Sequence, residues 1–361
     1  MKMNKIVYAA MFAAALTTAA SCSDDEPNGG DFVDFTTGVY VVNNGVQTGN
    51  VPGGITSYNI EDGTSVLDAF AAANAGTSIG DTPQSAIIHG SKMYIAVTAS
   101  NLIWVVDANS LRIIKSIKPE APMTEPRAFA AKDGKVYVSM YSGHVASIDT
   151  ISMTIDRSIE VGPNPEEIAI AGSTLYCANS DGMNWENSYG NCSLSLVDLD
   201  FWTERKIQAG LNPTKVVSNG TDVFVITMGN YSDIPATVKK INGTTVTDVC
   251  PGTLMDIRGN ELYVIDAPSG SGTVSYTVYN MLGNKVRDMV AEGVESPSDI
   301  TVDPVSGDIL ILSYHLGSSG WALYSDPCYA RLYKNDGTSR ASFDTGVGSI
   351  NAVFCHSAVR K

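Results

Sequence analysis

Basic residues are scarce in this chain, and their scarcity excludes several kinds of partner. Lys and Arg together number 23 against 38 Asp and Glu residues, so the formal net charge is −15 at pH 7. Nucleic acids and anionic membrane surfaces are bound through clusters of Lys and Arg, and we therefore expect neither as a direct partner. Contact with a membrane is expected only through a lipid anchor.

The short motifs of common enzyme classes are also missing. The chain contains no Gly-x-Ser-x-Gly elbow, no His-Glu-x-x-His pair, no phosphate-binding loop and no dinucleotide fingerprint. Glu166 and Glu167 follow a proline, where one carboxylate could face a central funnel, but the second carboxyl group that a glycosidase needs is not identifiable. No two cysteines have the short spacing of a zinc site. We therefore expect no enzymatic activity, no metal and no cofactor.

Helical sequence is nearly absent after the first residues, and a repeated β-pattern takes its place. The Ala-rich stretch 68–74 is expected to form one helical turn. Elsewhere an apolar strand, a turn, a strand ending in Asp or Asn, and a return through Gly and Pro recur seven times. The hydrophobic centres of one strand in successive repeats are Tyr40, Tyr94, Tyr137, Tyr176, Phe224, Tyr263 and Leu310.

Two further features recur with the same period. Asp or Asn ends a later strand, as at Asp107 and Asp149, because its side chain hydrogen-bonds the backbone two residues on and starts a turn. Proline marks the start of the first strand, as at Pro83 and Pro165, where its missing N–H does no harm. Four-stranded units that cannot bury both faces alone stack radially. We therefore predict an all-β fold, a seven-bladed β-propeller of four-stranded antiparallel blades, for residues 38–361.

The two ends of the chain are predicted to share the first blade. Residues 38–42 match the second strand of a unit, and residues 349–355 supply the missing first strand. This C-terminal strand completes the first blade, closes the ring and removes an exposed sheet edge that would invite aggregation. We expect one domain, monomeric outside any larger complex.

The N-terminus has the features of a lipoprotein leader. Lys2 and Lys5 precede an apolar stretch, 6–16, that is too short to span a bilayer. It runs into Ala-Ala-Ser-Cys, which is similar to a bacterial lipoprotein box with Cys22 as the acylated residue. Residues 1–21 are therefore expected to be a signal peptide, and residues 22–37 an acylated, flexible acidic tether. The alternative is an ordinary secreted protein with a chance cysteine.

Five cysteines lie within the predicted propeller, in what would be an oxidising compartment. Cys177 ends the second strand of the fourth blade, and Cys192 opens the third strand of the same blade. Neighbouring antiparallel strands can meet disulfide geometry, so we predict a Cys177–Cys192 disulfide that clamps the loop between them. Cys250, Cys328 and Cys355 are left without an assigned partner.

The two faces of the predicted propeller differ in their connections. What we call the long-loop face carries the loops from second to third strands and those from one blade to the next. The opposite, short-turn face carries short turns such as 89–91 and 132–134. Three second-to-third-strand loops are long, 43–54, 179–191 and 314–329, and the last two are aromatic. Because loops on a rigid scaffold carry binding, we place the site on the long-loop face.

The candidate ligand-binding residues come from these loops and from strand starts. Rings with an apolar body and a polar tip suit contact with a large ligand, although each could instead only pack its own loop. The residues expected to supply contact area are Trp185, Tyr189, Tyr231, Tyr314 and Trp321. Those expected to supply hydrogen bonds are Gln84, Arg127, Asn187 and Asn230. His144 and His315 lie on the same face and could act as an acid, a base or a metal ligand.

The repeat and the leader together carry a family resemblance. Strand starts of the type Pro-x-x-Ile, strands of the type Leu-Tyr-Val and strand ends of the type Val-Asp across residues 38–357 resemble YncE-like and surface-layer-type seven-bladed propellers. With the acidic tether behind Cys22, which looks like the surface-export signal of Bacteroidota lipoproteins, the chain is similar to the BtuG-type lipoproteins of gut Bacteroidota. No short ligand motif accompanies this resemblance, so the site residues rest on loop position.

The resemblance implies a function. A protein of this type would be lipid-anchored in the outer membrane and exposed at the cell surface. It would capture cobalamin (vitamin B12) or a related corrinoid and deliver it to a BtuB-type TonB-dependent transporter. His315 or His144 as a ligand of the cobalt is an open possibility. Two other functions stay open: a protein-interaction platform without a small ligand, and a propeller lyase or hydrolase acting on glycans or lactones.

Overall fold

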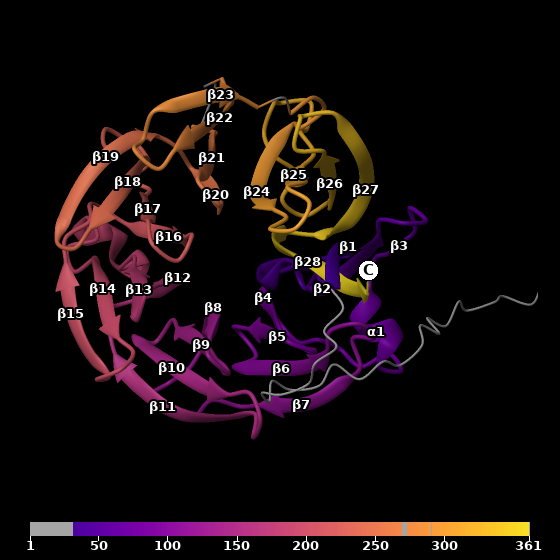
Figure 1. Cartoon of the computed structure of the whole chain (residues 1–361), viewed down its shortest axis with the longest axis horizontal. Coiled ribbons are helices and arrows are strands. Elements are labelled where there is room, and N and C mark those ends of the chain that lie inside the picture. Colours follow the sequence, from indigo (N-terminus) through magenta and orange to yellow (C-terminus); the bar gives the residue numbers. More distant parts are fainter. Residues whose placement is uncertain (1–31, 269–272, 290, 361) are drawn as a thin grey trace, which may run out of the picture.

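A ring of seven four-stranded antiparallel sheets forms the protein, as the sequence predicts (Figure 1). The computed structural model describes residues 32–268, 273–289 and 291–360. The leader, Cys22 and the tether up to residue 31 lie outside the described residues. Each sheet is one blade, and the first strand of each blade faces the centre of the ring. Within the described ranges, no helix is long and apolar enough to cross a membrane.

The strands follow each other from the centre of each blade to its outer edge. Blade 1 consists of β28 (Ser349–Arg360), β1 (Phe32–Asn43), β2 (Gly54–Asn59) and β3 (Ser65–Val66). Blade 2 consists of β4 (Pro83–His89), β5 (Lys92–Val97), β6 (Leu102–Asp107) and β7 (Ile113–Ile117). Blade 3 consists of β8 (Pro126–Lys132), β9 (Lys135–Met140), β10 (His144–Asp149) and β11 (Thr154–Glu160). Blade 4 consists of β12 (Pro165–Ala171), β13 (Thr174–Asn179), β14 (Ser193–Asp198) and β15 (Thr203–Ile207).

The remaining blades repeat this order. Blade 5 consists of β16 (Pro213–Ser218), β17 (Val223–Thr227), β18 (Thr237–Asn242) and β19 (Thr245–Pro251). Blade 6 consists of β20 (Leu254–Arg258), β21 (Glu261–Asp266), β22 (Ser275–Asn280) and β23 (Lys285–Asp288). Blade 7 consists of β24 (Ser296–Val302), β25 (Ile309–Tyr314), β26 (Pro327–Tyr333) and β27 (Ser339–Val347). The helical elements are α1 (Ala69–Ala73), as expected, and the 3-10 helices η1 (Gln47–Gly49) and η2 (Gly182–Asn187).

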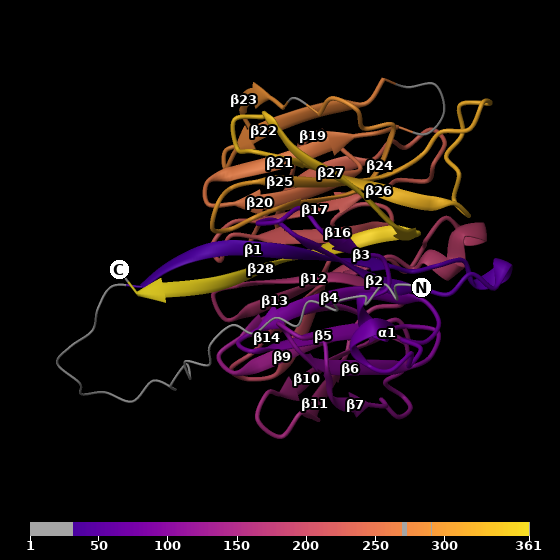
Figure 2. The same cartoon turned by 90° about the vertical axis from the view of Figure 1, so that its right-hand side faces the viewer.

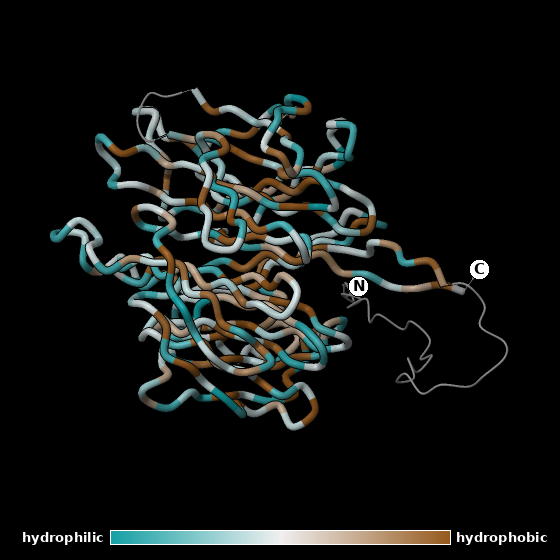
Figure 3. Tube along the Cα trace, turned by 60° about the vertical axis from the view of Figure 1, so that its left-hand side comes forward, coloured by the Kyte–Doolittle hydropathy of each residue, from teal (hydrophilic) through white to brown (hydrophobic). Residues whose placement is uncertain are grey.

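Alternation along the strands builds a hydrophobic core between every two neighbouring blades. Tyr137 of β9 packs with Leu175 between blades 3 and 4, whereas its neighbours Val136 and Val138 pack between blades 2 and 3. Side chains at successive strand positions point to opposite faces of a sheet, so one strand serves two cores. The last of these cores joins blades 7 and 1. The apolar side chains are thus inside the ring wall, and Figure 3 shows that many projecting connections are hydrophilic.

The predicted ring closure is confirmed, and the terminal strands are longer than expected. β28 pairs with β1 over most of its length, from Ser349 opposite Asn43 to Arg360 opposite Phe32. β1 begins at Phe32 rather than Gly38, and the ends of β1 and β28 project together from the short-turn face (Figure 2). The first blade is therefore held by pairing between the two ends of the chain.

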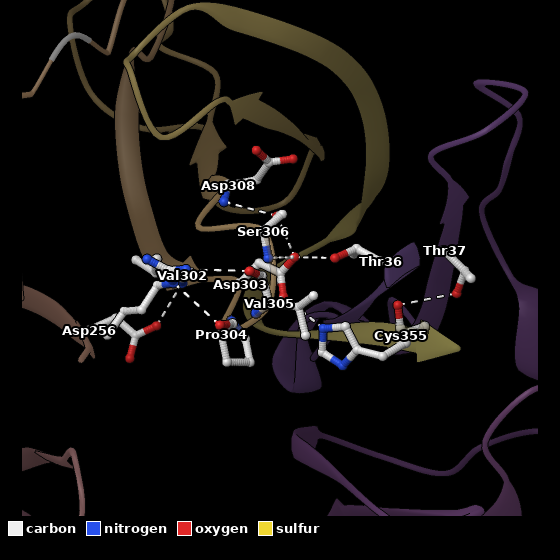
Figure 4. Close-up of polar contacts among 12 residues, drawn as sticks. Thr36, Thr37, Asp256, Val302, Asp303, Pro304, Val305, Ser306, Asp308 and Cys355 are labelled. Carbon is white, nitrogen blue, oxygen red and sulfur yellow. Dashed lines mark hydrogen bonds and ion pairs between the residues drawn. The ribbon is translucent and has the colours of Figure 1, made fainter. Parts of the chain in front are cut away.

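Asp303 fastens both terminal strands to blade 7 (Figure 4). It lies in the turn between β24 and β25, and its side chain has no exposed surface. His356 Nε2 lies 2.7 Å from its Oδ1, and Thr36 and Ser306 donate hydroxyl hydrogen bonds to its Oδ2. Burial alone would raise the pKa of Asp303, but the hydrogen bonds from Ser306, Thr36 and His356 outweigh it and lower the pKa.

The predicted disulfide between Cys177 and Cys192 is wrong, because both are free and buried. Cys177 lies opposite Ser195 on β14, and Cys192, directly before the start of β14, is an odd number of positions from Ser195. An odd offset sends the two side chains to opposite faces of the sheet. Cys177 packs between blades 3 and 4, whereas Cys192 Sγ lies 3.4 Å from the carbonyl oxygen of Gly210.

Candidate binding site on the long-loop face

Each proline that marks a first strand is followed by a β-bulge, and the bulges shape the centre of the long-loop face. In blade 4, Pro165 pairs with Asn179 and Ile168 with Cys177, so two glutamates stand opposite one residue. The same extra residue follows the corresponding prolines in blades 2, 3, 5 and 7. An inserted residue interrupts strict alternation and redirects side chains. Glu166 and Glu167 therefore both lie toward the centre but turn to different neighbours.

Glu166 turns toward blade 3, where it pairs with Arg127. Arg127 Nε donates to Glu166 Oε2 at 2.6 Å, and the guanidinium lies 4.8 Å from the centre of the Tyr141 ring. Ser180 Oγ lies 3.4 Å from the other carboxylate oxygen, Oε1. Burial raises the pKa of Glu166, although the charge of Arg127 opposes the shift. Arg127 is thus held by a carboxylate on one side and an aromatic face on the other.

Glu167 turns toward blade 5, where it meets Lys215. The Nζ of Lys215 lies 3.5 Å from Glu167 Oε1 and 2.9 Å from Asp299 Oδ1 of blade 7. Burial alone would lower the pKa of Lys215, but the charges of Asp299 and Glu167 outweigh it and raise the pKa. Asp256 lies nearby, and its burial raises its pKa to about 6 against the effect of Lys215. Blades 4, 5, 6 and 7 therefore meet in one charged network around Lys215.

Aromatic side chains stand beside the Arg127–Glu166 pair. The ring of Tyr231 is 60% exposed, and its hydroxyl accepts a hydrogen bond from Asn212 Nδ2 at 3.4 Å. Burial of the hydroxyl end raises the pKa of Tyr231, and the charges of Tyr189 and Glu166 raise it further. Tyr231 thus lies close enough to Tyr189 and Glu166 for their charges to raise its pKa, and Arg127 pairs with Glu166. Tyr189 is itself buried within its loop.

The loop between β13 and β14 carries two more predicted residues outward. Trp185 and Asn187 lie on η2, and the Trp185 side chain is 64% exposed. Asn187 donates a hydrogen bond to Asn184 Oδ1 at 2.6 Å. Asp181 anchors this loop by accepting hydrogen bonds from Asn184 at 2.9 Å and from the Asn191 N–H at 2.8 Å. The loop that the disulfide was expected to clamp is thus ordered by a buried aspartate.

The loop after β25 forms a second aromatic group on blade 7. Tyr314 packs edge-on against Tyr324, with ring centres 5.0 Å apart. His315 is exposed and lies 4.5 Å from the ring of Tyr329, which belongs to β26 rather than to the loop. Trp321 is 65% exposed. This second group presents flat apolar surface on a different side of the same face.

Three other candidates lie apart from these groups or have local partners. Asn230 folds its own loop, because its Oδ1 accepts the N–H groups of Ser232 and Ile234. Gln84 is half-buried at the start of β4 in blade 2. His144 begins β10, and its Nδ1 is buried with no hydrogen bond among the described residues. Across the described ranges, His, Cys, Asp and Glu form no cluster suited to a metal ion.

Sequence reasoning missed several members of the central group. Ser180, Asn212, Lys215 and Asp299 were not candidates, because the sequence does not show which inner-strand side chains meet across blades. The prolines at the strand starts were a usable signal, since each is followed by a bulge. This signal led to Arg127 and Glu166, which directly follow their prolines, and to Glu167 beside Glu166, but not to Lys215 and Asp299, which stand two residues after their prolines.

Cavities of about 670 and 270 Å³ lie away from the long-loop face. The larger lies between blades 6 and 7 on the short-turn face and is lined by paired charges, including Glu261, Arg287, Asp308 and Arg340. The smaller lies between the β18–β19 and β22–β23 turns. Both are bordered by short turns. The long-loop face instead offers an open surface of protruding rings around a polar centre.

The fold defines the class of this protein as a seven-bladed β-propeller, and comparisons with known proteins agree. A family described as a domain of unknown function (DUF5074) matches residues 37–185. The chain is similar to a quinonprotein alcohol dehydrogenase-like protein from Bacteroides thetaiotaomicron, at 15% identity and a TM-score of 0.62, over 89% of this chain and 79% of that one. No curated protein matches the chain.

Two further solved structures share the fold. A functionally unknown protein from Desulfotomaculum acetoxidans has 11% identity and a TM-score of 0.58, over 89% of this chain and 99% of that one. Hydrazine synthase from Kuenenia stuttgartiensis has 15% identity and a TM-score of 0.57, over 77% of this chain and 95% of that one. Identities this low show a common fold and leave function to the site itself.

Proposed function

We propose that the long-loop face binds cobalamin or a related corrinoid. The observation that carries this proposal is a set of exposed rings, Trp185, Tyr231, Trp321 and Tyr324, each 60–65% exposed, on the connections of one face. Exposed large rings on one side of a molecule commonly mark a binding surface. A corrinoid is broad and flat, with an apolar ring edged by amides, and needs both aromatic area and hydrogen-bond partners.

The two aromatic groups suit a ligand wider than one blade. Blades 4 and 5 supply Trp185 and Tyr231, and blade 7 supplies Trp321 and Tyr324. Glu166, which pairs with Arg127, lies close enough to Tyr231 to raise its pKa, and the pair would supply polar contacts. Unpaired polar groups cost about 1–3 kcal/mol each when buried, so matched amides would provide selectivity as well as affinity.

We further propose that the protein is a lipid-anchored binding protein of the outer membrane that delivers its ligand to a BtuB-type TonB-dependent transporter. This part is supported by the leader and by the Cys22 sequence context, which are similar to those of surface lipoproteins. Mass spectrometry of the membrane-extracted protein should detect an acylated Cys22, and Cys22→Ala should release the protein from the membrane. An unmodified Cys22 in the mature chain would contradict the anchor.

Titration with cyanocobalamin, followed by calorimetry and by the corrinoid absorbance spectrum, tests the binding proposal. We expect saturable binding, weakened roughly tenfold by Trp185→Ala or Trp321→Ala because each removes a contact ring. Phe201→Ala is the matched control, since Phe201 is 81% exposed on the opposite face. Absence of heat and of a spectral change at micromolar concentration would overturn the proposal. If both tryptophan variants bind cyanocobalamin as tightly as the wild type, the binding site does not include these two rings.

A further inference from the structure

Arg127 keeps two donor nitrogens, Nη1 and Nη2, unused at the centre of the long-loop face. Only its Nε is engaged, by Glu166 Oε2, and among the described residues neither Nη1 nor Nη2 donates a hydrogen bond. A guanidinium carries five N–H donors in a fixed fork. The side chain is 24% exposed and lies over the Tyr141 ring. Its remaining N–H groups therefore have a set direction without a protein acceptor.

Glu166 keeps an acceptor beside those donors. Its Oε2 is taken by Arg127, whereas its Oε1 receives only the long, 3.4 Å hydrogen bond from Ser180. A carboxylate oxygen has room for about two hydrogen bonds. The pair therefore offers donors from Arg127 and an acceptor from Glu166 next to each other.

The charges around the pair disfavour an anion. Arg127 is already neutralised by Glu166, and Lys215, the other central cation, is engaged by Glu167 and Asp299. The whole chain carries a formal charge of −15. An additional carboxylate or phosphate would face uncompensated negative charge. A neutral group with both an acceptor and a donor fits the pair better.

We propose that Arg127 and Glu166 together recognise a primary amide of the ligand. An Nη–H of Arg127 donates to the amide carbonyl oxygen, and Glu166 Oε1 accepts from the amide NH₂ group. The inference rests on the proposed function for its natural ligand, because a corrinoid bears primary amides along its edge. The Tyr141 ring lies against the guanidinium and helps to hold its orientation.

Lys215 engages Glu167, and this leaves Glu166 available to accept a hydrogen bond from the ligand amide. Glu167 pairs with Lys215 of blade 5, and Glu166 pairs with Arg127 of blade 3. Blades 3 and 5 lie on opposite faces of blade 4, and consecutive side chains of a strand point to opposite faces. The position of the Arg127–Glu166 pair thus depends on the start of β12 at Pro165 and on the two cations, Arg127 and Lys215, that flank the adjacent glutamates.

Acetamide and acetate, titrated separately into the purified protein, test the pair without relying on corrinoid binding. The probe is the ¹⁵N–¹H signal of Arg127 Nε, assigned by its loss in Arg127→Lys. We expect acetamide to shift this signal in a saturable way and acetate to leave it in place. An acetate response equal to that of acetamide, or no response to either, would overturn the inference.

Glu166→Gln provides the sharper variant. It removes a negative charge and one acceptor, so the preference should change from acetamide to acetate. Glu261→Gln is the matched control, because Glu261 also pairs with an arginine, Arg287, but on the short-turn face and through both terminal nitrogens of the guanidinium. An unchanged preference in Glu166→Gln would contradict the assignment. If Glu166→Gln does not fold, as judged by circular dichroism, Arg127→Met must abolish the acetamide saturation measured by ligand-detected NMR.

A corrinoid comparison separates this inference from the proposed function. Cyanocobalamin and its monocarboxylic acids differ by one amide changed to a carboxylate. We expect one of these acids to bind the wild type roughly tenfold more weakly, and Glu166→Gln to remove the difference. Acetamide binding without cyanocobalamin binding would overturn the proposed function alone. Cyanocobalamin binding with no amide preference would overturn the subsite alone.

Discussion

The two faces of the propeller come from the same repeat but use polar side chains in opposite ways. On the short-turn face, Asp149 and Asp198 accept backbone N–H groups of their own turns, and Asp303 is fully engaged by its neighbours. On the long-loop face, Arg127 keeps free donors, and Trp185 is largely exposed. Satisfied polar groups hold the ring together, whereas groups left unsatisfied are available to a ligand.

The largest effect is expected from removing the strand that joins the two ends of the chain. A chain ending at Gly348 loses β28, which leaves β1 without its inner partner and exposes the cores beside blade 1. We expect loss of the cooperative unfolding transition, measured by circular dichroism on heating. A truncated protein that still unfolds cooperatively would show that the ring does not depend on its closure.

Replacing Asp303 should destabilise the protein without affecting ligand affinity. Asp303→Ala leaves Thr36, Ser306 and His356 without their acceptor in a buried site, and we expect a loss of about 2–4 kcal/mol in the free energy of unfolding. Urea denaturation measures this value. Asp198→Ala is the control, because its turn is exposed and should cost about 1 kcal/mol or less. Equal losses in the free energy of unfolding of the two variants would show that Asp303 contributes no more than an exposed turn aspartate.

Ionisation of Asp303 should contribute to the pH dependence of the free energy of unfolding. The pKa of Asp303 is lowered in the folded protein, so its contribution is fully present above the unfolded value of about 3.9 and is lost as the pH falls through the folded value. Asp303→Asn should therefore flatten the fall in stability below about pH 4. Denaturation midpoints measured across that range check the difference. An identical acid dependence in the variant would show that other carboxylates dominate.

The smallest effect on the fold is expected from the loop anchor on the opposite face. Asp181→Ala removes the acceptor of Asn184 and Asn191, so the loop that carries Trp185 should lose its fixed geometry. We expect ligand affinity to fall several-fold while the free energy of unfolding changes by about 1 kcal/mol. Calorimetry and urea denaturation together separate the two effects. A drop in stability as large as that of Asp303→Ala would erase the contrast between the faces.

Much of the architecture could be predicted because it depends on local chemistry. The recurring apolar strands, the turn-forming Asp107 and the strand-starting Pro165 each act over a few residues, and the structure confirms the blades they predict. The Cys177–Cys192 disulfide could not be judged in this way. Its failure depends on the exact register of β13 with β14, where one residue of offset changes the face on which a side chain lies.

The candidate site shows the same division. Loop length and aromatic content predicted the face on which Trp185 and Trp321 are exposed, because long connections must lie at the surface. The meeting of Arg127 with Glu166, and of Lys215 with Asp299, joins residues from different blades. Such pairs have no local signature, since they form only when separate inner strands converge on one axis.

The sequence by itself determined the repeat, the number of blades and the sharing of blade 1 by the two termini, because strand alternation and turn chemistry are short-range. Only the tertiary structure decided which thiols stay apart, that Asp303 fastens the closing strands, and that Glu166 and Glu167 turn to different partners. The physical reason is that register, bulges and the packing of seven blades set the direction of each side chain. A shift of a single position in any of them would send that side chain to another neighbour.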